Sequence, residues 1–61
     1  MSNGLVDYAH PCMMAEAALK KLLSAMLGNE YDKALEAGLQ AMVEVKLTLA
    51  AIRHMKEQAQ Q

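Results

Sequence analysis

The sequence predicts an all-α protein, an antiparallel two-helix hairpin that assembles as a dimeric four-helix bundle or a higher oligomer. Ala, Leu, Met, Lys, Glu and Gln, which all favour helix, make up most of the chain. Apolar residues recur at helical spacing in two stretches, and Gly28 separates them. A chain of 61 residues is one domain at most and buries little surface alone. A partner is therefore part of the prediction.

The first helix is expected over residues 11–27, after an N-terminal arm of residues 1–10. The residue before a proline avoids the helical conformation, and proline suits the first helical position, so this helix starts at Pro11. An alternative start has Asp7 as the N-cap and Pro11 inside the first turn. The apolar positions follow one helix face. They are Ala15, Ala18, Leu19, Leu22, Leu23 and Met26.

The connection between the helices is expected to be a tight turn at Gly28. A left-handed glycine closes a helix without steric cost, and Asn29 can cap the helix that follows. Glu30 and Asp32 then place negative charge at the positive end of that helix. Because so little chain joins the two helices, they must run antiparallel.

The second helix is expected over residues 30–58, with residues 58–61 frayed. Its main seam has near-heptad spacing. The seam consists of Tyr31, Leu35, Gly38, Met42, Val45, Leu49 and Ile52. A second line flanks this seam and consists of Ala34, Ala41, Thr48 and Met55. Residues 43–49 also alternate in a strand-like pattern, but strong helix formers surround them, so helix is preferred. Val43, Leu47 and Ala51 then form another apolar face.

The two helices differ in length, and this difference predicts self-association. At 1.5 Å per residue they span about 25 Å and about 43 Å, so the first covers the second only to about Lys46. The expected oligomer interface lies mainly beyond that point. It consists of Val43, Leu47, Leu49, Ile52 and Met55.

Composition excludes several classes of protein. The single cysteine allows no internal disulfide, which is typical of the cytoplasm. No apolar run is long enough to cross a membrane, and no signal peptide is expected. A net charge of −1 argues against a general nucleic-acid binder. No spacing suggests a catalytic group, so we expect neither an enzyme nor a cofactor.

Two residue clusters could still carry chemistry. His10 and Cys12 flank Pro11 and could form a redox or metal site, but zinc needs four ligands and only His54 and acidic residues remain. The preferred interpretation is a boundary histidine and a small buried cysteine, with no metal. Lys46, Arg53 and Lys56 lie close to one line and could contact phosphates. A small nucleic-acid-binding hairpin dimer is therefore the alternative function.

The segment of residues 49–57, Leu-Ala-Ala-Ile-Arg-His-Met-Lys-Glu, resembles short helical proteins encoded by bacteriophages and prophages. This resemblance implies a small accessory protein in the host cytoplasm that binds or inhibits a host protein. The leading prediction is thus a non-enzymatic, homo-oligomeric protein–protein interaction module.

Overall fold

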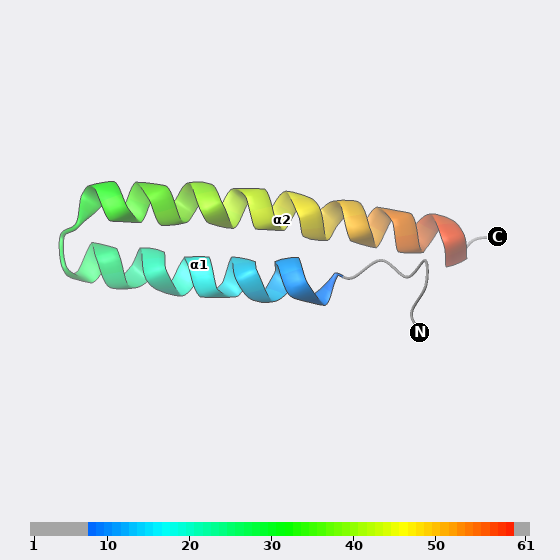
Figure 1. Ribbon diagram of the computed structural model, residues 1–61, viewed down its shortest axis with the longest axis horizontal. Coiled ribbons are helices and arrows are strands. Elements are labelled where there is room, and N and C mark those ends of the chain that lie inside the picture. Colours follow the sequence, from blue (N-terminus) through cyan, green and yellow to red (C-terminus); the bar gives the residue numbers. More distant parts are fainter. Residues whose placement is uncertain (1–7, 60–61) are drawn as a thin grey trace.

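The computed structural model describes residues 8–59, and they form two helices that lie side by side and run antiparallel (Figure 1). Helix α1 spans Ala9–Leu27 and helix α2 spans Tyr31–Ala59. The predicted all-α hairpin is confirmed, and no residue between 8 and 59 is in a strand. The strand-like alternation at residues 43–49 therefore lies within a helix.

Helix α1 begins two residues earlier than the preferred prediction. Pro11 lies inside the first turn, as the alternative start proposed, and Tyr8 takes the N-cap position without a side-chain cap. The amide of Cys12 donates to the carbonyl oxygen of Tyr8 at 3.2 Å. A proline is tolerated here because the first amides of a helix have no intrahelical acceptor. Asp7, the cap proposed for that start, lies outside the described residues.

The turn closes with a left-handed residue, but this residue is Asn29, at φ 60°, and not Gly28, at φ −93°. The Asn29 amide donates to Met26 O at 3.1 Å, and the Glu30 amide donates to Ala25 O at 2.8 Å. These two bonds make a Schellman motif, in which the left-handed residue follows the C-cap. The prediction for Gly28 was wrong by one position. Asparagine adopts this conformation at lower cost than other residues with a side chain.

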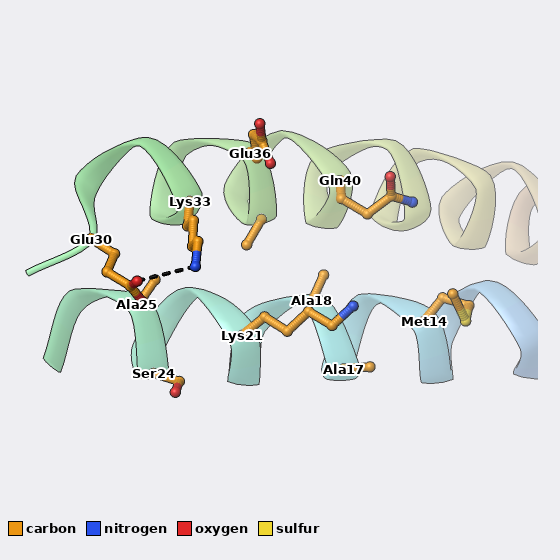
Figure 2. A pocket seen from close by; sticks show the side chains of 11 residues that line it. Met14, Ala17, Ala18, Lys21, Ser24, Ala25, Glu30, Lys33, Glu36 and Gln40 are labelled. Atoms are coloured by element: carbon orange, nitrogen blue, oxygen red, sulfur yellow. Dashed lines mark hydrogen bonds and ion pairs between the residues drawn. The ribbon is translucent and has the colours of Figure 1, made fainter. Parts of the chain in front are cut away.

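The contact between the helices is built from small residues. Every buried residue within 8–59 is an alanine or a proline, and none of the large side chains there is fully buried. The buried positions are Pro11, Ala15, Ala18 and Ala25 on α1, and Ala34, Ala37, Ala41 and Ala51 on α2. Figure 2 shows Ala18 pointing from α1 toward α2. Short side chains on both surfaces let the two backbones approach closely.

This contact corrects the predicted seam of α2. The line of Ala34, Ala41 and half-buried Thr48 faces α1, whereas the large residues of the predicted main seam are exposed. Ala51, expected on another face, is buried as well. Gly38 is the one exception, because it is half-buried and a Cβ there would lie 3.3 Å from Leu22 Cδ1. Glycine at this position leaves room for the half-buried Leu22.

The same contact sets the register of the hairpin. Since Leu22 lies beside Gly38, each residue before Leu22 is level with one equally far after Gly38, and Ala9 is level with Ala51. Helix α1 therefore covers α2 to Ala51, further than the predicted limit at Lys46. Figure 1 shows the last turns of α2 continuing past the start of α1.

Candidate interaction surface

One broad face of the hairpin carries charged and polar side chains among small apolar ones. An open pocket runs between the helices on this face. Its lining combines charged, polar and small residues: Met14, Ala17, Ala18, Lys21, Ser24, Ala25, Glu30, Lys33, Glu36, Ala37 and Gln40. Lys33 Nζ lies 3.1 Å from Glu30 Oε2, the ion pair drawn as a dashed line in Figure 2. Both partners are more than half exposed, so this pair contributes little to stability.

The opposite broad face follows from helix geometry. Two positions along a helix turn the side chain by about 200°, to the other side. On α2, Leu35 and Met42 come two positions after pocket residues Lys33 and Gln40. On α1, Leu19 comes two positions before Lys21 and Met26 two positions after Ser24. Large apolar residues of both helices therefore share the face opposite the pocket.

We call this surface the apolar face. It comprises Leu19, Leu23 and Met26 of α1, and Tyr31, Leu35, Met42, Val45, Leu49 and Ile52 of α2. Each of these side chains is between 42% and 67% exposed. None of the nine carries a charge. A contiguous exposed surface of this kind marks an interaction site in most proteins.

The α2 part of the apolar face is the predicted heptad seam. The sequence predicted the spacing of this stripe correctly. It did not predict its direction, since the large residues of the stripe point away from α1. On α1, the sequence analysis placed the residues of the apolar face and those of the helix contact in one stripe. Residue size distinguishes the two groups, since the alanines of α1 face α2 and the larger residues lie on the apolar face.

The residues predicted for the oligomer interface are all exposed, between 41% and 53%. They do not form one surface. Leu49 and Ile52 lie on the apolar face. Val43 and Leu47 come seven positions after the pocket residues Glu36 and Gln40, so they lie toward the pocket side of α2. Met55 follows the line of Ala34, Ala41 and Thr48, beyond the start of α1.

The other candidate residues are exposed too. Lys46, Arg53 and Lys56 are exposed on α2, with Lys46 and Arg53 on one side and Lys56 rotated away from Lys46 by about 80°. Cys12 is an exposed free thiol, which corrects the expectation of a buried one. Within residues 8–59, no group of three His, Cys, Asp or Glu side chains is placed to hold a metal ion.

Neither α1 nor α2 combines the length and the apolar character that a membrane-crossing helix requires. Comparisons with family models, with curated proteins and with solved structures found no match to this chain.

Proposed function

We propose that the protein is a non-enzymatic interaction module that works as a homo-oligomer assembled through the apolar face. One observation carries this proposal: within residues 8–59 the hairpin buries only alanine and proline, while most of the large apolar side chains remain on its surface. The resemblance to phage-encoded helical proteins suggests that the assembled form binds a further protein. That second partner stays a prediction.

Energetics support the proposal. Burying a leucine or isoleucine side chain stabilises by roughly 1.5–3 kcal/mol, and an alanine contributes much less. A hairpin held by alanines alone therefore has little to offset the conformational entropy that folding costs. Covering the nine residues of the apolar face in an oligomer supplies the missing stabilisation.

The test is sedimentation equilibrium over a range of micromolar concentrations, with helicity measured by circular dichroism. We expect the unchanged protein to self-associate. The double variant Leu49→Lys/Ile52→Lys should raise Kd at least about a thousandfold, because a dimer would lose four apolar side chains, and helicity should fall with association.

The matched control is Met13→Lys/Leu27→Lys. Both residues are exposed, and each lies two positions after a buried residue, on the side of α1 that points away from α2. This variant should associate like the unchanged protein. A monomer that unfolds cooperatively at micromolar concentration would contradict the proposal.

A further inference from the structure

We infer that the apolar face is covered by a second copy with its turn at the opposite end, so that α2 packs antiparallel against α2 of the other copy. This inference rests on the proposed function and specifies its partner and orientation. Two hairpins can also meet face to face with both turns at one end. In that case α2 packs against α1 of the other copy.

The lengths of the helices favour opposite ends. With both turns at one end, the part of α2 beyond Ala51 would extend past α1 of both copies, so neither α1 would reach Ile52. With turns at opposite ends, α2 of one copy packs along the length of α2 of the other copy. Ile52, which is 48% exposed in the single hairpin, is then covered.

Charge also favours opposite ends. Near the turn, Glu30, Asp32 and Glu36 outnumber Lys33, for a net charge of −2. The far part of α2 carries the opposite excess. There, Lys46, Arg53 and Lys56 outnumber Glu44 and Glu57, for a net charge of +1. Packing α2 antiparallel against α2 of the other copy brings these unlike charges together.

The apolar stripe of α2 fits this antiparallel pairing in one register. Its residues are spaced alternately four and three apart, so they occupy two kinds of heptad position. In an antiparallel pair of helices, a residue of one kind faces a residue of the other kind. Leu35 then faces Ile52 of the other copy, and Met42 faces Val45. Gly38 is level with Leu49 of the other copy, and the space beside Gly38 is filled by Leu22 of its own α1. The symmetry axis crosses α2 between residues 43 and 44.

The flanking residues agree with this register. On the outer edge of the stripe, Asp32 and Arg53 occupy equivalent positions, because they are three heptads apart. The register brings Asp32 of one copy beside Arg53 of the other, twice in each dimer. Both residues are exposed in the single hairpin.

Distances between spin labels test the orientation. In a Cys12→Ala background, single labels are placed at Glu36→Cys, Val43→Cys and Ala50→Cys, which are seven residues apart and occupy equivalent positions on α2. For turns at opposite ends, the two labels of a dimer lie nearly level at residue 43. At residues 36 and 50 they are offset along the axis by roughly 20 Å, at 1.5 Å per residue.

We expect the label-to-label distance to be shortest at residue 43 and clearly longer at both other positions. Equal distances at all three positions would overturn the orientation and leave the proposed function standing. Sedimentation of each labelled protein is the control for assembly. If the labelled and the unlabelled proteins both stay monomeric, both proposals are overturned.

Discussion

Asn29 is the residue on which the turn depends, because it alone among the residues 8–59 other than glycine has a positive φ. The neighbouring Gly28 has an ordinary φ of −93°, and a Cβ added to it would meet no atom closer than 3.7 Å. A sequence alone suggests the reverse, since glycine is the usual left-handed residue after a helix. The backbone hydrogen bonds to Ala25 and Met26 decide between the two positions.

We therefore predict opposite effects for two alanine substitutions in this turn. Asn29→Ala should lower the free energy of unfolding by about 1 kcal/mol, because alanine is strained in the left-handed region. Gly28→Ala should be neutral or stabilising by up to about 1 kcal/mol, because it restricts the unfolded chain. Urea unfolding at one protein concentration measures both. If Gly28→Ala is the more damaging change, the assignment of the left-handed residue is wrong.

At the scale of the element, the sequence predicted each helix to within about two residues but misplaced the residues between them. Both candidate stripes of α2 repeat every seven residues, so periodicity could not choose between them. Leu35 and Ala34 stand for these two stripes, and their side chains point about 100° apart around the helix. The structure places the alanine inside because α1 also presents alanines, and two surfaces of small residues pack closely. Large residues on one surface alone would hold the helices apart.

The alanine contact makes a prediction about volume. Ala41 is 5% exposed in the middle of the contact, so Ala41→Leu should push the helices apart and cost about 1–3 kcal/mol of stability. Ala50→Leu adds the same volume at an exposed position of the same helix and should change stability by less than about 0.5 kcal/mol. Thermal unfolding followed by circular dichroism compares the two variants. Equal stabilities would show that α1 and α2 do not pack through this line.

At the scale of the whole molecule, the sequence predicted that apolar surface exceeds what the hairpin can bury. It attributed the excess to the end of the longer helix, beyond about Lys46. In the structure nine of the exposed large apolar residues share one broad face, including Leu19 and Leu23 of α1, and others, such as Leu27 and Leu47, lie elsewhere. This could not be predicted, because the side on which a residue lies depends on the helix contact. That contact was assigned to the larger residues.

Charge at the two ends of the hairpin yields the last prediction. If Asp32 lies beside Arg53 of the other copy, Asp32→Asn should weaken the dimer about two- to thirtyfold, since two exposed contacts are lost at roughly 0.2–1 kcal/mol each. Arg53→Gln should have a similar effect. With both turns at one end, Asp32 and Arg53 of the two copies lie far apart, so neither change should weaken the dimer through a lost contact. The effects should shrink at high salt, as expected for exposed charges.

A double-mutant cycle separates this contact from effects on each helix alone. Asp32 also lies in the first turn of α2, where its charge favours the helix dipole, so the single variant mixes two causes. If the two residues touch across the dimer, Asp32→Asn/Arg53→Gln should cost clearly less than the sum of the single changes. Lys20→Gln, on the side of α1 away from α2, is the control and should leave Kd unchanged. Strict additivity in the cycle would show that Asp32 and Arg53 are not neighbours.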